Sequence, residues 1–225
     1  MTKKTYAGDL TPQQTWDMLS EFPKAQLIDV RTNAEFVYVG PYMQYMSGVA
    51  DTQVKWILEY RSDNPGISDG DMFLSNDPWV GAPHQQDVML ICPVFWEGEL
   101  FAWITNCLHQ YDIGGATPGS FCPAAESSFD EGICLPPVKI IEGFEIRRDI
   151  EEVYLRSSRK PEMVALDFRA QMVGNSSARQ RLLDLIQRYG SATVKGVMKK
   201  VIADSETSYL EKMARLPDGV WQDRT

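Results

Sequence analysis

Two apolar runs joined by a short turn constrain the fold more than any other feature of the sequence. Residues 88–96 and 100–108 are rich in Val, Ile, Leu, Phe and Trp, and Glu97-Gly98 separates them. Strand-like runs on either side of two turn residues are typical of a β-hairpin. The sequence therefore predicts an antiparallel hairpin that belongs to a larger sheet.

The rest of the chain predicts helices around this hairpin. A length of 225 residues with 44% hydrophobic residues is enough to bury a core. Apolar periodicity and the Pro and Gly positions predict helices over residues 41–61, 161–189 and 192–214, and loops over residues 63–70 and 114–137. The expected fold class is α+β: a mixed fold with a central, hairpin-containing antiparallel sheet and flanking helices.

The two histidines of the chain each precede an aspartate by three residues. His84 is followed by Asp87 and His109 by Asp112. With a two-residue turn at Glu97-Gly98, His109 lies opposite Gln86, so the two histidines become diagonal neighbours with Cβ atoms roughly 5 to 8 Å apart. Two imidazoles at that separation can share one metal ion, and we predict a metal site of His84, Asp87 and His109.

The position of Asp87 sets a condition on this site. In a regular strand its odd offset from His84 would direct it to the opposite face, so the site requires a turn or bulge over residues 83–87. Asp112 could orient a histidine or a bound water from outside the ligand set. Asp77 could reach the site, although its place in an Asn-Asp-Pro-Trp turn favours a capping role.

A simpler interpretation of these residues is a pair of hydrogen-bonded histidines near a strand end. The hairpin geometry and the paired aspartates favour the metal site instead. Two imidazoles and one carboxylate suit Mn, Fe or Zn acting as a Lewis acid, and the residue pattern does not choose among these ions.

Charge and motifs exclude several function classes. A net charge of -9 argues against a nucleic-acid or anionic-membrane surface. No apolar run approaches a membrane span, no signal peptide follows Met1, and the four cysteines form no C-x2-C pair. We therefore expect a cytoplasmic protein with reduced thiols. Neither a phosphate-binding G-x4-G-K-[ST] loop nor a G-x-G-x-x-G motif is present.

The first 40 residues read differently from the rest. Their stretch LTPQQTWDML…AQLIDVRTNAEF resembles the opening helix and strand of a rhodanese domain, over residues of about 5–40. The nucleophilic Cys loop of a rhodanese does not follow. We therefore divide the chain into a rhodanese-like N-terminal fragment, residues 1–40, and a second region, residues 41–225.

The second region resembles the hydantoinase B and oxoprolinase family, which includes the alpha-type subunits of acetone and acetophenone carboxylases. The stretches that carry the resemblance are NDPWVGAPHQQDVMLICPVFWEGELFAWITNCLHQYDIGGATPGS, AAESSFDEGICLPPVK, DFRAQMVGNSSARQRLLDLIQRYG and the closing LPDGVW. In acetone carboxylase a manganese ion is held by a His, an Asp three residues later and a further His. These positions match His84, Asp87 and His109, so the resemblance implies manganese. It also implies a partial domain of a longer subunit.

Three functions remain open on this resemblance. The leading one is the metal-binding portion of an ATP-dependent ketone carboxylase, with ATP used on a hydantoinase A-type partner subunit. It is favoured by Gly-Ala-Pro-His84 and His109-Gln110, where many hydantoinase-type members have Gly-Gly-Thr-His and His-His. The alternatives are an ATP-dependent hydrolase of a cyclic amide, such as a hydantoin or 5-oxoproline, and a non-catalytic fragment or chimera.

Overall fold

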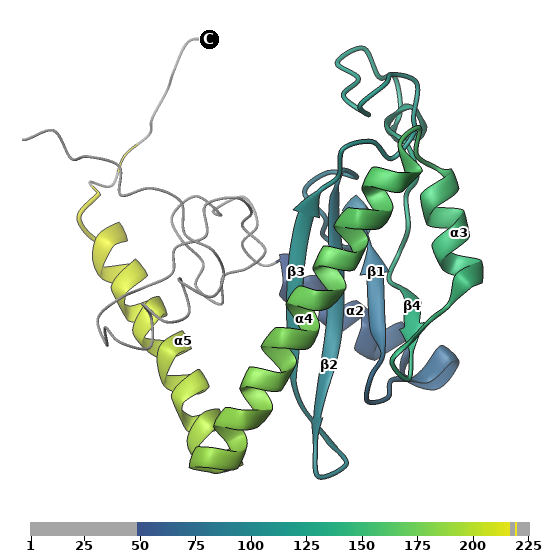
Figure 1. Cartoon of the computed structure of the whole chain (residues 1–225). Coiled ribbons are helices and arrows are strands. Elements are labelled where there is room, and N and C mark those ends of the chain that lie inside the picture. Colours follow the sequence, from purple (N-terminus) through teal and green to yellow (C-terminus); the bar gives the residue numbers. More distant parts are fainter. Residues whose placement is uncertain (1–48, 217–218, 220–225) are drawn as a thin grey trace, which may run out of the picture.

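The computed structural model describes residues 49–216 and residue 219, which form an α+β fold (Figure 1). Its α-helices are α2 (Val49–Tyr60), α3 (Arg148–Arg156), α4 (Pro161–Tyr189) and α5 (Ser191–Met213). Its strands are β1 (Met72–Ser75), β2 (Asp87–Trp96), β3 (Glu99–His109), β4 (Val138–Glu142) and β5 (Glu145–Ile146). Short helical turns lie at η3 (Ser62–Gly66), η4 (Pro78–Val80) and η5 (Ser128–Glu131).

The strands form one antiparallel sheet in the order β3-β2-β1-β4-β5. The predicted hairpin is its longest unit, and Glu97 and Gly98 turn the chain with positive φ angles of 52° and 83°. Near this turn Phe95 faces Leu100, as a two-residue turn requires. A bulge after Val94 then shifts the pairing by one residue, so His109 faces Asp87. Our predicted pairing of His109 with Gln86 was wrong for this reason.

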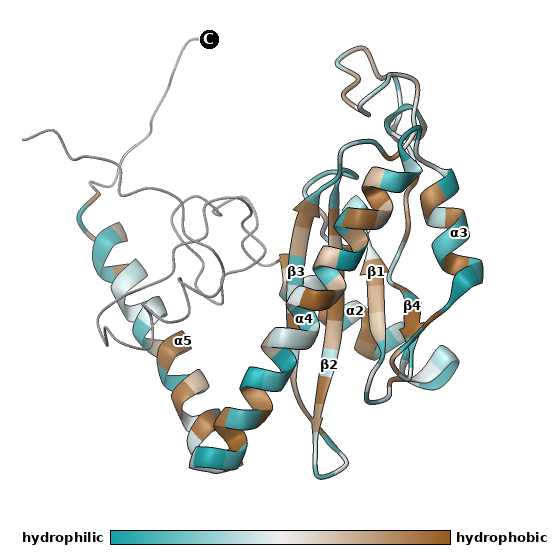
Figure 2. Cartoon of the chain, in the orientation of Figure 1, coloured by the Kyte–Doolittle hydropathy of each residue, from teal (hydrophilic) through white to brown (hydrophobic). Residues whose placement is uncertain are grey.

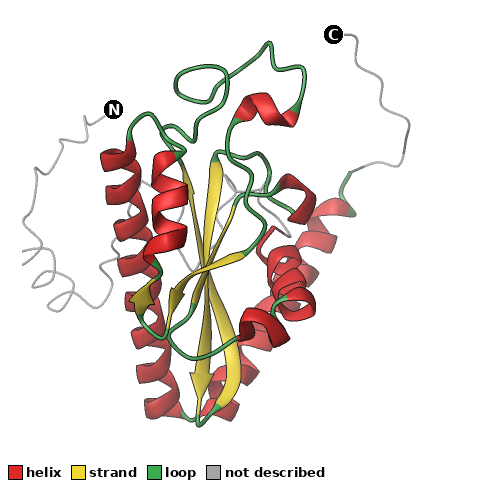
Figure 3. Ribbon diagram, turned by 90° about the vertical axis from the view of Figure 1, so that its right-hand side faces the viewer, coloured by secondary structure: helices red, strands yellow, loops and turns green. Residues whose placement is uncertain are grey.

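Helices cover both faces of the sheet (Figure 3). Because side chains alternate along β2, Val88, Leu90 and Cys92 belong to the core cluster that includes Val164 and Phe168 of α4. Met89 and Ile91 point the other way and join Val49 and Ile57 of α2 in a second cluster. Figure 2 shows apolar colouring along much of strands β1 to β4.

A buried amide network holds α4 against the hairpin. Gln171 donates from Nε2 to the Val88 carbonyl and to Asn106 Oδ1, each at 2.9 Å. Asn106 donates to Asn175 Oδ1 at 2.9 Å, and Asn175 donates to the Leu90 carbonyl at 2.9 Å. All three side chains are buried. The network therefore fixes where α4 lies along β2 and β3.

The expected fold class is confirmed, and so is each long element within the described residues. Predicted residues 161–189 coincide with α4, and residues 114–137 are irregular apart from η5. The first part of the predicted helix over residues 41–61 and the whole rhodanese-like segment, residues 1–40, lie outside the described residues. All four cysteines are free thiols. Within the described part of the chain, no helix combines the length and apolar character needed to cross a membrane.

Candidate metal centre

His84 lies in a tight turn immediately before β2. Residues 83–86 are turn and bend, and the Asp87 amide donates to the His84 carbonyl at 3.1 Å. This turn meets the condition that the sequence set for the site, because His84 no longer follows the side-chain alternation of the strand. The Gln85 carbonyl accepts a 2.6 Å hydrogen bond from Nδ2 of the buried Asn76. This bond helps to hold the turn in place.

Asp87 and His109 come from the adjacent ends of β2 and β3. They are directly opposite each other in the ladder, so their side chains share the face of the sheet that α2 covers. The bulge after Val94 is what brings this pair into register. In a hairpin without the bulge, His109 would face the residue before Asp87.

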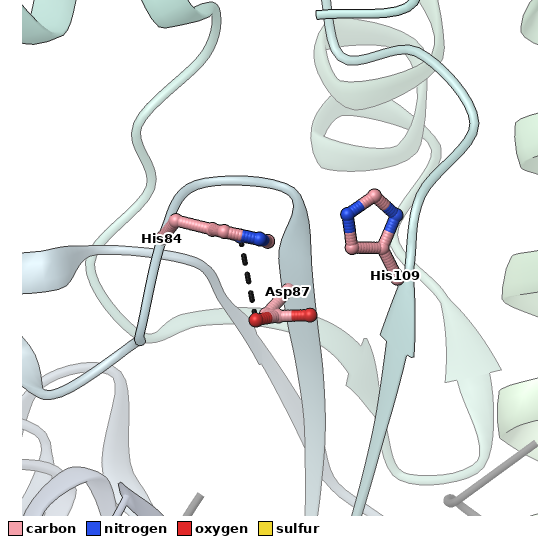
Figure 4. Close-up of side chains that lie close together, drawn as sticks. All are labelled: His84, Asp87 and His109. Carbon is pink, nitrogen blue, oxygen red and sulfur yellow. Dashed lines mark ion pairs between the residues drawn. The ribbon is translucent and has the colours of Figure 1, made fainter. Parts of the chain in front are cut away.

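The three side chains converge at this end of the hairpin (Figure 4). The imidazole centroids of His84 and His109 are 5.0 Å apart and the rings are nearly perpendicular, at 81°. Nδ1 of His84 lies 3.3 Å from Oδ2 of Asp87. One donor atom from each residue falls within 4.8 Å of the other two. Ligand atoms about 2.1 Å from a shared ion lie at such separations, so this is a possible metal site.

The surroundings of Asp87 fit a cation. Its side chain is 5% exposed, whereas that of His84 is 46% exposed. Burial raises the pKa of Asp87, and the two neighbouring imidazoles act in the opposite direction. Oδ2 of Asp87 is buried and accepts no hydrogen bond, although it lies 3.3 Å from Nδ1 of His84. A buried carboxylate oxygen without a donor is costly, and a divalent ion would compensate its charge.

Asp112 does not orient either histidine in the structure. Its Oδ1 accepts hydrogen bonds from the Gly114 and Arg159 amides at 2.9 and 3.0 Å, and its Oδ2 accepts from the Gly119 amide and Arg159 Nη1 at 2.8 and 3.1 Å. Burial alone would raise the pKa of Asp112, but these bonds outweigh it and lower the pKa to about 2. Both oxygens thus bind the glycine-rich loop that follows and Arg159.

The bonds to Asp112 show which group the backbone amides of the Gly-rich segment bind. The Gly114-Gly115 and Pro118-Gly119-Ser120 stretches could have offered backbone N–H groups to a bound anion. In the structure two of these amides, those of Gly114 and Gly119, bind the carboxylate of Asp112, three residues beyond His109. Arg159, 47 residues further along, has no sequence signal that links it to the site.

Asp77 is a helix cap, as its turn composition favours. Its Oδ1 accepts the Trp79 amide at 2.8 Å at the start of η4. Its carboxylate also raises the pKa of the Cys134 thiol, after the larger effect of burial. These contacts lie outside the His84, Asp87 and His109 group.

Comparison with known proteins assigns the chain to a family. The Hydantoinase B/oxoprolinase family matches residues 24–225. The chain belongs to this family. The match reaches back into the segment that we interpreted as rhodanese-like, and the boundary at residue 40 stays a prediction.

Relatives in this family carry out two kinds of chemistry. The acetophenone carboxylase delta subunit of Aromatoleum aromaticum is 34% identical over 75% of this chain and 25% of its own length. A putative D-/L-hydantoinase subunit of a Pseudomonas species is 30% identical over 80% of this chain and 29% of its own. The crystal structure of the ATP-dependent caprolactamase from Pseudomonas jessenii superposes with a TM-score of 0.69 and 29% identity, over 78% of this chain and 30% of that one.

The chain therefore spans between a quarter and a third of the length of these relatives. They are carboxylase or amide hydrolase subunits.

Proposed function

We propose that this chain is the metal-binding portion of an ATP-dependent ketone carboxylase of the acetone and acetophenone type. The convergence of His84, Asp87 and His109 at one end of the hairpin carries this proposal. Two imidazole nitrogens and one carboxylate oxygen suit Mn, with Fe and Zn as alternatives. A divalent ion bound there would polarise a carbonyl and stabilise the negative charge of an enolate.

The three residues differ in their exposure to solvent and in what each would supply to a bound ion. Asp87 is buried and supplies the negative charge of the site, while His84 and His109 are exposed and supply nitrogen donors. A small ketone can therefore approach the imidazole side from solvent without entering the core. We assign ATP use to a hydantoinase A-type partner subunit, because the chain contains no phosphate-binding motif.

Hydrolysis of a cyclic amide is the second candidate. The likeness to caprolactamase and to the hydantoinase relative favours it. Gly-Ala-Pro-His84 and His109-Gln110, together with the higher identity to the acetophenone carboxylase subunit, favour carboxylation. In the hydrolase, the same three ligands would hold an ion that polarises the amide carbonyl.

Reconstitution separates these functions. The chain is combined with its cognate partner subunits, ATP and MnCl2, and is given either acetone or acetophenone with labelled bicarbonate, or 5-oxoproline or a hydantoin. We expect label to enter an acid-stable carboxylate product with ATP consumption, which is followed as AMP or ADP. His109→Ala should abolish this product, whereas Asp77→Ala, which removes a carboxylate outside the group, should retain it.

Two results would contradict the proposal. Ring opening of 5-oxoproline or of the hydantoin, without carboxylation of either ketone, would transfer the assignment to the hydrolase. No turnover of any substrate by the assembled, metal-loaded complex would make this chain a non-catalytic fragment.

A further inference from the structure

The loop that follows His109 is held rigidly at several points. Besides the bonds to Asp112, Nη1 of Arg159 donates to the Gly114 and Thr117 carbonyls at 3.1 and 3.3 Å. Ser120 Oγ accepts from the Ile113 amide and donates to the Gly114 carbonyl, both at 2.8 Å. Residues 114–120 are thus held by Arg159, two residues before α4, and by bonds within the loop, so they can anchor a neighbouring segment.

Gln86 connects this anchor to the turn that carries His84. Its Nε2 donates to the Gly119 carbonyl at 2.7 Å. Its own carbonyl accepts the Gln110 amide at 2.7 Å and the Val88 amide at 3.1 Å. A single residue between two of the metal-site residues therefore contacts the loop, the end of β3 and the start of β2.

We propose that Gln86 is a positioning residue that holds the His84 ring beside His109. His84 lies outside the β2–β3 ladder, so the pairing that aligns Asp87 with His109 does not place it. Its position depends on the contacts of its turn, and Gln86 ties that turn to the braced loop. The consequence for metal affinity rests on the proposed function, whereas the consequence for the ring geometry does not.

The size of the effect follows from the short reach of a metal ligand. Imidazole nitrogens must lie about 2.1 Å from a shared ion, so a turn that shifts by an ångström takes His84 out of range. Removing groups that orient metal ligands typically weakens metal binding about 10- to 100-fold. We expect a loss of this size when the bond from Gln86 to Gly119 is removed.

Proton NMR of the metal-free protein tests the ring geometry directly. The chain has two histidines, so its imidazole spectrum contains two sets of signals. Wild type should show a nuclear Overhauser effect between the rings, whose centroids are 5.0 Å apart. Gln86→Met keeps the side-chain length but removes the donor, and should reduce this effect at least about twofold. Gln86→Lys restores a donor that can reach the Gly119 carbonyl, and should recover it.

The matched control is Gln180→Met, which removes an exposed amide donor that contacts Asp184 on the surface of α4. It should leave the inter-ring effect unchanged. An unchanged effect in Gln86→Met, or no effect in wild type, would overturn the proposal even if Gln86→Met melts at a lower temperature.

Titration with MnCl2, read from the electron paramagnetic resonance of the free ion, tests the consequence for binding. We expect the dissociation constant to rise about 10- to 100-fold in Gln86→Met and to stay at the wild-type value in Gln180→Met. Equal affinity in wild type and Gln86→Met would overturn the positioning role. A wild type that shows the inter-ring effect but binds no Mn²⁺ would contradict the proposed function and still support the role of Gln86 in ring geometry.

Discussion

At the scale of single residues, two aspartates that look alike in sequence have opposite environments. Asp87 and Asp112 each follow a histidine by three positions. Asp87 has a buried oxygen without a donor and a raised pKa, whereas Asp112 accepts bonds from three amides and a guanidinium and has a lowered pKa. The environment of Asp87 suits a metal ligand, and that of Asp112 suits a residue that stabilises the loop.

The lowered pKa of Asp112 predicts an acid-dependent loss of stability. Its folded-state pKa of about 2 lies below the ~3.9 of an unfolded aspartate. The stabilisation is therefore complete above about pH 4 and is lost as the pH falls towards 2. We expect a contribution of about 1 kcal/mol, less than the full shift implies, because the Arg159 side chain is 39% exposed.

Urea unfolding of wild type and Asp112→Asn at pH 6 and pH 2.5 measures this contribution. The difference in unfolding free energy between the two proteins should shrink at the lower pH. A constant difference would show that Asp112 is not ionised in the folded protein or that its bonds do not stabilise it.

The sequence identified the three side chains that converge but not what holds them. His84 and Asp87 are three residues apart, and the hairpin signal brings Asp87 close to His109, so the proximity of the three residues could be inferred from the sequence. Gln86 and Arg159 support the site through side-chain contacts with carbonyl groups, and residue type alone gives no partner for such bonds. Asp112 was first considered as a group that orients a histidine or a bound water. Its bonds to Arg159 could not be foreseen for the same reason.

At the scale of elements, the long strands and helices were predictable and the short ones were not. The two hairpin strands and α4 carry long apolar patterns that differ clearly from loops. Strands β1 and β4 have only 4 and 5 residues. They are stabilised by pairing with each other, and β1 also pairs with β2 and β4 with β5. The bulge after Val94 lies within the hairpin, away from its turn, and shifts the pairing by one residue, so the register at His109 could not be read from the turn alone.

The buried amide network predicts how strongly α4 is fixed to the hairpin. Gln171→Leu fills a similar volume but removes the donor that serves the Val88 carbonyl and Asn106 Oδ1. Buried acceptors that lose their donor are costly, so the free energy of unfolding should fall by about 2 kcal/mol. Urea denaturation followed by far-UV circular dichroism measures the change.

Gln180→Leu on the exposed side of the same helix is the control, and it should change the free energy by less than about 0.5 kcal/mol. Equal effects of the two substitutions would mean that the network does not contribute to holding the helix in place.

At the scale of the whole molecule, the candidate site lies at the end of a hairpin that is packed independently of it. Val88, Leu90 and Cys92 are buried against α4, and Met89 and Ile91 are buried against α2. The sheet should therefore keep its structure when a ligand is lost, which separates this site from structural zinc sites. The family assignment is at the same scale: it covers residues 24–225 and does not distinguish carboxylation from amide hydrolysis.

Metal content of the purified chain tests the central claim most directly. After growth in medium supplemented with Mn and Fe, elemental analysis should find about one ion per wild-type chain, and His109→Ala should retain less than about a tenth of it, because one of three ligands is gone. Asp77→Ala should keep the wild-type content, and far-UV circular dichroism should be the same for all three proteins. Equal metal in wild type and His109→Ala, or no metal in wild type, would contradict a metal centre at His84, Asp87 and His109.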